Sequence, residues 1–410
     1  MRRVLMVCYY FPPLGGVGSL RALKFATYLP EFGWEPTVLA PRNGTYFRDP
    51  TLAFPEEKVI RTLSLEISRW GKRAVGSTSG DTEPAAVGPL LHRVRAFVRR
   101  WIYRPDPQVG WYPFAVHSAR RALREGRFDA IFSSSVPITA HVIAARLQRD
   151  SGLPWLAEFR DPWSEYLGPQ DPRRAAARRL EVAILQKARA VVVPSPEWAE
   201  LFSAKGAREV AVITNGFDPA DFGSPSPRPQ FTITHVGSFY PEKQDLSAAW
   251  AALALLRESG QAPGLRLRFV GEIDPRLRAQ IADHGLDDVL EVTGFLPYRA
   301  VLEEMGRSSA LLLAGGRDDR PSLKGMIPAK VFEYLATGLP IIYVGDLRTD
   351  VAGLLRSHVG CHLVAPGDTE EARQALLQAV AERLVSRELA DFTRRELTAR
   401  LARTLEDVCR

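Results

Sequence analysis

Short apolar runs alternate with segments of helical periodicity along the whole chain. The apolar runs predict strands near 4–10, 36–40, 129–134, 155–160, 190–194 and 210–214, and then near 231–237, 265–271, 289–294, 309–314, 340–345 and 361–365. The intervening pattern predicts helices, notably over 18–31, 113–125, 137–150, 171–187, 246–259, 328–337 and 369–383. This alternation is typical of parallel βαβ units, so we expect an α/β fold.

Two stretches interrupt the alternation. Residues 72–90 combine Gly, Ser, Thr, Pro and Ala without a period, which predicts a mobile surface loop. Residues 215–230 are rich in turn formers and proline and separate the two series of strands. At 410 residues the chain also exceeds the size that one hydrophobic core supports. We therefore predict an N-terminal domain over 1–215, joined by a C-terminal helical segment over 386–410, and a second domain over 216–385.

The composition is that of an ordinary globular protein, with 46% hydrophobic and 25% charged residues. Cys8, Cys361 and Cys409 lie far apart without a CxxC pair, which predicts reduced thiols of a cytoplasmic protein. No apolar stretch reaches the roughly 18 residues that a membrane span needs. The apolar N-terminus continues into Tyr-Tyr-Phe-Pro-Pro without a cleavage site, so we interpret it as the first strand rather than a signal peptide.

The charge balance favours an anionic partner. A total of 54 basic and 47 acidic residues gives a net charge of +7, which suits a nucleotide, an anionic lipid surface or an acidic polymer. Residues 92–112 interleave arginines with aromatic side chains, as does an interfacial helix on an anionic membrane. A helix packed on the domain with its arginines outward would show the same pattern. RNA-binding motifs are absent, so no nucleic acid is expected.

The most informative stretch is 328–344, which predicts a short helix that ends at Gly338 and is followed by a buried strand. Lys330 and Glu333 share the polar face of this helix. Ile327, just before it, offers no side-chain oxygen to cap the first amides, which leaves them available to an external acceptor such as a phosphate. A solvated Lys–Glu pair on a surface helix is the alternative.

Two other clusters follow predicted strands, at the edge where open α/β sheets bind ligands. Gly15 and Gly16 lie between the first strand and the first helix, where they could approach a phosphate or simply form a tight turn. The strand that ends at Gly237 is followed by Ser238 and Lys243, and Lys243 could hold a phosphate or be a solvated cation.

Further charged residues suggest recognition of hydroxyl and phosphate groups. Glu158, Arg160 and Asp161 follow another strand, and a structural Arg–Asp pair is their alternative role. Arg320 and Lys324, in the loop ahead of the opening helix, could neighbour a phosphate or be solvated. The seven histidines show no HxxH or HExxH pairing, and neither a GxSxG nor a P-loop motif occurs, which disfavours a metal site, a serine hydrolase and a P-loop kinase.

Taken together, these motifs resemble those of a GT-B glycosyltransferase of the retaining family 4 type. The markers, in order along nearly the whole chain, are Tyr9–Gly16, Lys24–Pro30, Glu158–Trp163, Asn215–Asp218, Gly237–Tyr240 and Lys330–Leu335. The resemblance implies two Rossmann-like domains facing across a cleft, with a nucleotide-sugar donor held mainly by the second.

The resemblance also implies roles for single residues. Glu333 would accept hydrogen bonds from the ribose hydroxyls, and Lys243 would hold the diphosphate with Ser238 nearby. The Gly15–Gly16 turn would approach the phosphates or sugar from the first domain. No metal or other cofactor is implied, because positive groups and helix amides stabilise the departing diphosphate. Retention would follow from same-face attack assisted by the leaving phosphate.

The chain departs from the family pattern near the donor sugar. Gly325 stands where the family often carries a glutamate, Ser238 where it commonly carries arginine, and Arg160 nearest to where a histidine often contacts the sugar. Arg320, Lys324 or Lys330 could supply the missing charge. The predicted catalytic residues are Lys243, Glu333, Arg160 and Asp161, and the predicted donor-binding residues are Gly15, Gly16, Gly237, Ser238, Lys243, Arg320, Lys324, Ile327, Lys330 and Glu333.

We therefore expect transfer of a hexosyl or related sugar to a cell-envelope, exopolysaccharide or other glycoconjugate acceptor, in the cytoplasm or at the inner face of the cell membrane. Two alternatives remain open. A nucleotide-sugar epimerase of the same fold would need acid/base residues, which Glu158, Arg160 and Asp161 do not obviously supply. A non-catalytic nucleotide-sugar-binding protein would fit the missing carboxylate at Gly325.

Overall fold

The computed structural model describes residues 1–65, 104–168, 170–226, 228–316, 321–382 and 384–410. They form two compact units. The first comprises Met1–Val193, Ala199–Ile213 and Thr398–Arg410, and the second comprises Pro194–Trp198 and Thr214–Leu397. The predicted loop at 72–90 lies outside the described residues.

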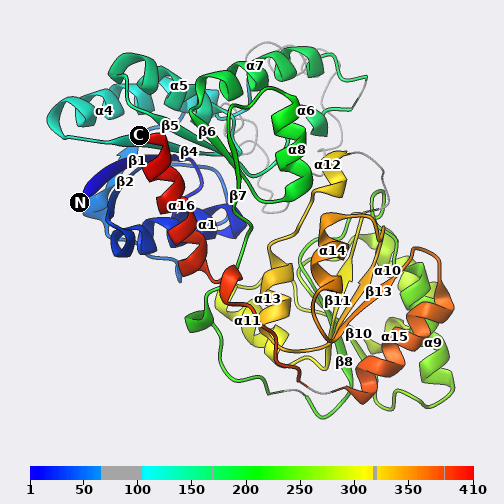
Figure 1. The fold of residues 1–410 in the computed structure, drawn as a ribbon. Helices are drawn as coiled ribbons and strands as arrows, with labels where there is room; N and C mark the ends of the chain where they lie inside the picture. The colour runs from blue at the N-terminus through cyan, green and yellow to red at the C-terminus, as the bar shows by residue number, and fades with distance from the viewer. Residues whose placement is uncertain (66–103, 169, 227, 317–320, 383) are drawn as a thin grey trace. The chain divides into compact units, whose positions relative to one another are not determined.

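The first unit is built on a parallel sheet of seven strands in the order β3-β2-β1-β4-β5-β6-β7 (Figure 1). Its strands are β1 (Arg2–Cys8), β2 (Trp34–Pro41), β3 (Val59–Thr62), β4 (Ala130–Ser135), β5 (Trp155–Phe159), β6 (Ala190–Val193) and β7 (Val210–Val212). Every residue of β4, β5 and β6 is buried, as expected for parallel strands covered on both faces. Its helices are α1 (Gly16–Tyr28), α4 (Tyr112–Glu125), α5 (Thr139–Ser151), α6 (Trp163–Tyr166) and α7 (Arg174–Lys187).

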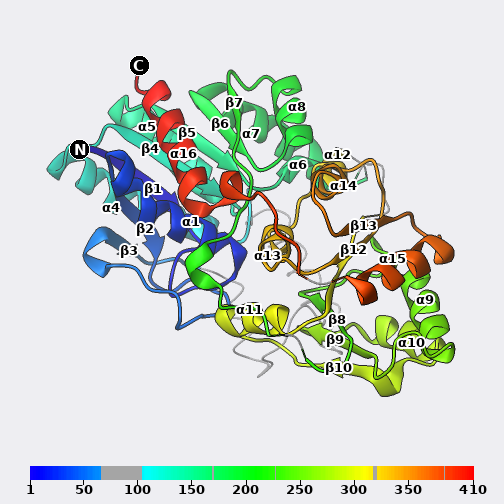
Figure 2. The ribbon, with the colours of Figure 1, turned by 60° about the horizontal axis from the view of Figure 1, so that its bottom comes forward.

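The second unit is built on a parallel sheet of six strands in the order β10-β9-β8-β11-β12-β13. Its strands are β8 (Thr232–Val236), β9 (Arg266–Val270), β10 (Leu290–Val292), β11 (Ala310–Ala314), β12 (Ile341–Val344) and β13 (Cys361–Val364). Its helices are α9 (Ser247–Glu258), α10 (Pro275–Asp283), α11 (Tyr298–Gly306), α12 (Pro321–Lys324), α13 (Lys330–Ala336), α14 (Asp350–Arg356) and α15 (Thr369–Ala381). Helices α9 and α15 pack side by side (Figures 1 and 2). Two parallel Rossmann-like sheets confirm the predicted fold class.

The chain passes between the units within two helices. Helix α8 (Pro196–Ala204) has its first turn in the second unit, and α16 (Arg394–Val408) likewise begins in the second unit and continues in the first. The predicted assignment of the whole 386–410 segment to the first domain therefore differs from the structure for residues 386–397. These residues pack with the second unit because their backbone is hydrogen-bonded to Phe217, near the start of the main segment of that unit.

That pairing joins the start and the end of the main segment of the second unit. The amide of Phe217 donates to the carbonyl oxygen of Phe392 at 3.1 Å, and the amide of Arg394 donates to the carbonyl oxygen of Phe217 at 2.7 Å. Gly216 is required here, since a Cβ at this position would lie 2.1 Å from the Phe392 oxygen. The predicted linker is thus a hydrogen-bonded part of the fold.

Trp111 corrects part of the prediction for residues 92–112. Its side chain is fully buried, and its indole Nε1 donates to the hydroxyl of Thr62 at 2.8 Å. The ring of Tyr9 packs edge-on against it, with centroids 5.5 Å apart. Trp111 therefore belongs to the core of the first unit and is not available to a membrane surface, while residues 92–103 lie outside the described part of the chain. None of the helices in that part is long and apolar enough to cross a membrane.

Candidate donor site

Polar groups meet at the carboxyl end of β8 in the second unit. Lys330, at the start of α13, donates from its ammonium to the carbonyl oxygen of Val236 at 2.6 Å. The same nitrogen lies 3.4 Å from Nε2 of His235, whose Nδ1 lies 3.1 Å from the Leu312 carbonyl oxygen. Burial lowers the pKa of Lys330 to about 8, with Glu333 opposing the shift, and burial lowers the pKa of His235 well below its ordinary value.

Glu333, one turn further along α13, is also inside the protein and only 7% exposed. Burial raises the pKa of its carboxyl to about 7, while the charge of Arg394, a hydrogen bond from Tyr298 and the charge of Lys330 pull it down. Asp221 adds a like charge nearby, which raises the pKa further. The alternative of a solvated Lys–Glu pair on a surface helix is therefore wrong.

The start of α13 differs from the prediction in two ways. The helix begins at Lys330, two residues later than predicted, and no side chain caps it, as expected. However, the amide of Val331 donates to the Pro328 carbonyl at 3.0 Å, and that of Phe332 donates to the Ala329 carbonyl at 3.2 Å. A tight turn therefore occupies two of the amides that were expected to be free. Ile327 is buried in the apolar core of this unit.

The loop after β8 carries the exposed polar groups of the site. Gly237 has φ of +86°, a left-handed backbone that favours glycine, and Ser238 and Lys243 are exposed. The ammonium of Lys243 lies 5.7 Å from the centre of the Tyr240 ring, and no carboxylate among the described residues pairs with it. Gln244 anchors the loop by donating to the Ala314 carbonyl at 2.9 Å. Lys243 is thus a free cation on a tethered loop.

The Trp198 side chain fills the space that a Cβ on Gly325 would need. A Cβ at this position would lie 2.2 Å from Cδ1 of Trp198 and 2.9 Å from Oγ of Ser195. Trp198 is 2% exposed, so its indole is packed and cannot simply swing away. The structure therefore explains the missing glutamate sterically. Lys324, at the end of α12, is partly buried and helps to lower the pKa of Asp346, whereas Arg320 lies outside the described residues.

In the first unit, the glycine turn is already covered by its own chain. The amide of Gly15 donates to the Phe47 carbonyl at 2.8 Å, and a Cβ on Gly15 would lie 2.5 Å from the Phe47 ring. Gly16 has φ of +82°, and a Cβ there would lie 2.9 Å from the ring of Tyr46. In this conformation the turn is structural, and the Gly15 amide is not available to a phosphate.

Arg160 and Asp161 lie in the first unit but do not form the alternative Arg–Asp pair. Arg160 donates from Nε to the Ser135 carbonyl and from Nη2 to the Val136 carbonyl, each at 2.7 Å. Its guanidinium lies over the first turn of α1, where a Cβ on Gly18 would clash with it. The Asp161 carboxylate instead accepts from the Tyr166 hydroxyl at 3.0 Å, and burial raises its pKa.

Glu158 is a structural residue. Its carboxylate accepts from Nε of Arg21 at 2.8 Å and from the hydroxyl of Ser134 at 2.5 Å, and neither Arg21 nor Glu158 is exposed. Arg21 also donates to the Ile213 carbonyl at 2.7 Å. The predicted hydroxyl-recognition cluster therefore loses its glutamate to a buried ion pair, and Arg160 and Asp161 remain.

Three residues that surround the α13 pair are not among those predicted from the sequence: His235, Tyr298 and Arg394. A histidine within a predicted strand, two residues before the glycine turn, is a usable signal for His235. Tyr298 and Arg394 had no such signal, because only the fold brings them to Glu333.

Two family models match the chain. Residues 15–216 match a glycosyl transferase 4-like domain, and residues 230–382 match the glycosyl transferases group 1. The chain therefore belongs to the glycosyl transferase family, with a 4-like domain followed by a group 1 domain. This agrees with the expected family, and the two matched segments fall on the two parallel sheets.

Individual relatives of this chain are distant. WcaL of Escherichia coli strain K12, whose name assigns it provisionally to colanic acid biosynthesis, is 29% identical over 206 residues. The match covers 48% of this chain and 48% of WcaL, so the chain spans about half the length of that relative.

Solved structures share the fold at low identity. Sucrose-phosphate synthase from Thermosynechococcus elongatus has a TM-score of 0.62 at 16% identity, covering 100% of this chain and 96% of that one. Anabaena HepE, solved with UDP and glucose, has a TM-score of 0.59 at 16% identity, covering 100% and 97%.

Proposed function

We propose that this glycosyltransferase moves a sugar from a nucleotide-diphosphate donor, bound by the second unit, to a polysaccharide or other cell-envelope acceptor. The observation that carries the proposal is the Lys330 ammonium at the carboxyl end of β8, with the buried Glu333 one turn along the same helix and Lys243 on the loop that follows β8. This is the edge of an open α/β sheet at which ligands bind.

The side chains suit a nucleotide diphosphate. The Glu333 carboxylate would accept hydrogen bonds from ribose hydroxyls once ionised. The Lys330 ammonium has three donors, and two are directed at Val236 and His235, so one is left for a phosphate oxygen. Lys243 would add a second positive charge and stabilise the departing diphosphate. In this proposal the leaving phosphate assists attack on the same face of the sugar, without a dedicated carboxylate nucleophile or a metal.

The nucleotide and the acceptor are proposed from the relatives. HepE has been solved with UDP and with UDP-glucose, so uridine donors are the first to test. The names of WcaL and of the amylovoran biosynthesis glycosyltransferase AmsK of Erwinia amylovora point to exopolysaccharide assembly. We place the reaction in the cytoplasm, at the inner face of the membrane, with residues 92–112, apart from the buried Trp111, as the proposed contact to anionic lipid.

Calorimetric titration of UDP-, GDP-, ADP- and dTDP-sugars tests the proposal. Glu333→Ala and Lys243→Ala should each weaken binding of the preferred donor about tenfold or more, while both variants stay folded. Glu303→Ala and Lys187→Ala remove exposed charges of the same sign elsewhere and should leave the affinity unchanged. Unaltered affinity for every donor in both site variants would contradict the proposal, and NMR of the product anomer tests retention.

A further inference from the structure

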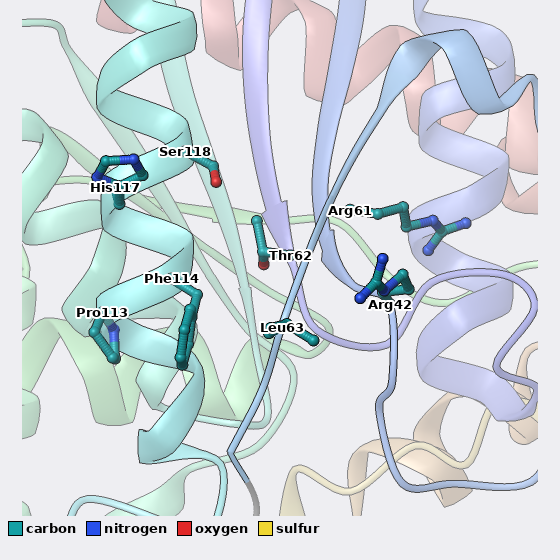
Figure 3. Close-up of a pocket in the computed structure, with 8 residues that line it drawn as sticks. All are labelled: Arg42, Arg61, Thr62, Leu63, Pro113, Phe114, His117 and Ser118. Atoms are coloured by element: carbon teal, nitrogen blue, oxygen red, sulfur yellow. The ribbon is translucent and has the colours of Figure 1, made fainter.

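A second site opens in the first unit, at the edge strand of its sheet (Figure 3). A pocket of about 390 Å³ lies at the ends of β2 and β3, beside α4. Arg42 directly follows β2 and Leu63 directly follows β3. Helix α4 forms the other wall with Pro113, Phe114, His117 and Ser118. Its volume lies within the range of small-molecule sites, and its place is the carboxyl edge of a parallel sheet.

The charged lining of this pocket is basic. Arg42, Arg61 and His117 line it, and the residues of the described chain that line it include no carboxylate. Arg61 is already held, because it donates to Glu56 at 2.6 Å and to the Pro12 carbonyl at 2.5 Å, and its guanidinium points away from α4 (Figure 3). Arg42 is exposed, and no acidic partner for its side chain is found among the described residues. Arg42 is therefore the cation available to a ligand.

The rest of the lining offers hydroxyl donors and an apolar wall. The Thr62 hydroxyl oxygen accepts from Nε1 of Trp111 at 2.8 Å, which leaves the hydroxyl proton to be donated into the pocket. Leu63, 40% exposed, and Phe114 supply apolar surface on opposite sides (Figure 3). Such a lining suits an anionic group carried on a larger organic body better than a free inorganic ion.

We propose that this pocket binds an anionic group of the sugar acceptor, a phosphate or a carboxylate, through Arg42 and the Thr62 hydroxyl. The inference rests on the proposed glycosyl transfer, since it assigns part of the second substrate. It also favours a charged acceptor, because a neutral glycan would gain no charge-assisted hydrogen bond from the Arg42 guanidinium.

Titration of the whole protein with small probes tests this assignment. Glucose 1-phosphate carries a phosphate, glucuronate carries a carboxylate, and glucose carries neither. We expect one or both anions to bind, glucose not to bind, and Arg42→Ala to weaken the anion about tenfold or more. Arg127→Ala removes an exposed arginine just before β4, at the amino end of a strand and not the carboxyl end, and should leave the affinity unchanged. Binding of the phosphate alone assigns a phosphate-linked acceptor, and binding of the carboxylate alone assigns an acidic sugar.

Two results would overturn the inference: no binding of either anion at millimolar concentration, or equal binding by wild type and Arg42→Ala. Donor binding separates this failure from failure of the proposed function. Arg42→Ala should bind the nucleotide-sugar as wild type does, because Glu333 and Lys243 belong to the second unit. If Glu333→Ala and Lys243→Ala leave donor binding unchanged while Arg42→Ala still weakens anion binding, the protein has the anion site but another function.

Discussion

The Lys330 ammonium donates a 2.6 Å hydrogen bond to the carbonyl oxygen of Val236, a residue 94 positions earlier in the chain. This bond ties the first turn of α13 to the last residue of β8. It places a positive charge, with its pKa lowered to about 8 by burial, at the sheet edge where we propose that the diphosphate binds.

The position of this ammonium predicts proton uptake on donor binding. At pH 8 Lys330 is about half protonated, and a phosphate placed beside it would raise its pKa and draw in up to about 0.5 proton. Calorimetry of UDP-glucose binding at pH 8 in buffers of different ionisation enthalpy measures that uptake. Lys330→Met should abolish it and weaken binding, whereas Lys187→Met should preserve both.

Glu333 predicts a pH dependence of folding stability. Its pKa is about 7 in the folded protein against an ordinary value of 4.5, so between these values the folded state holds a proton that the unfolded state has lost. Its contribution to the free energy of unfolding is therefore complete below pH 4.5 and is lost as the pH rises to 7. The loss is about 3 kcal/mol at most. Urea denaturation at pH 5 and pH 7.5 measures the fall.

Glu333→Gln is the matching variant, because glutamine does not titrate. The decrease in unfolding free energy between the two pH values should be smaller in Glu333→Gln than in wild type. An identical decrease in both proteins would show that the carboxyl titrates normally. Glu303→Gln, on the exposed face of α11, should follow wild type.

The packing of Trp198 against Gly325 predicts a steric penalty. Gly325→Ala should lower the free energy of unfolding by about 1–3 kcal/mol, because its Cβ would lie 2.2 Å from the indole. Gly223→Ala, with nothing within 4 Å of the added Cβ, should cost much less. In a Trp198→Ala background the cost of Gly325→Ala should shrink. A cost that is the same in both backgrounds would rule out the clash.

The buried Arg21–Glu158 pair predicts a non-additive effect on stability. Arg21→Met leaves the Glu158 carboxylate buried without its partner and should cost about 3–5 kcal/mol. The double variant Arg21→Met, Glu158→Leu should recover much of that loss. Arg121→Met breaks the exposed pair with Glu125 and should cost less than about 1 kcal/mol. Thermal or urea unfolding of the four proteins measures the coupling.

Regular alternation made the sheets predictable from the sequence. Buried parallel strands appear as continuous apolar runs, and β11 and β12 show this plainly. Lys330 and Glu333 could be singled out because a polar pair followed by an abrupt helix end and a strand is a local pattern. Whether they were exposed depended on β8 and on Arg394, which are remote in the sequence.

The misplaced expectations have the same physical origin. Glu158, Arg160 and Asp161 are close in the chain, but Glu158 lies within β5 while Arg160 and Asp161 lie in the bend that follows it, and each has its own partner. Gly15 looked available to a phosphate because the residue that occupies its amide, Phe47, lies more than thirty residues later. The clash at Gly325 required the position of Trp198, which no local pattern encodes.

The backbone pairing of Phe217 with Phe392 and Arg394 has a consequence for gene architecture. Because the main segment of the second unit starts and ends at neighbouring residues, it has the geometry of an insertable cassette. The cassette is incomplete by itself, since Pro194–Trp198 supplies the indole that packs on Gly325. A chimera designed to exchange donor specificity between relatives must therefore carry both segments. One that moves 214–397 alone would lack the indole that fills the space beside Gly325.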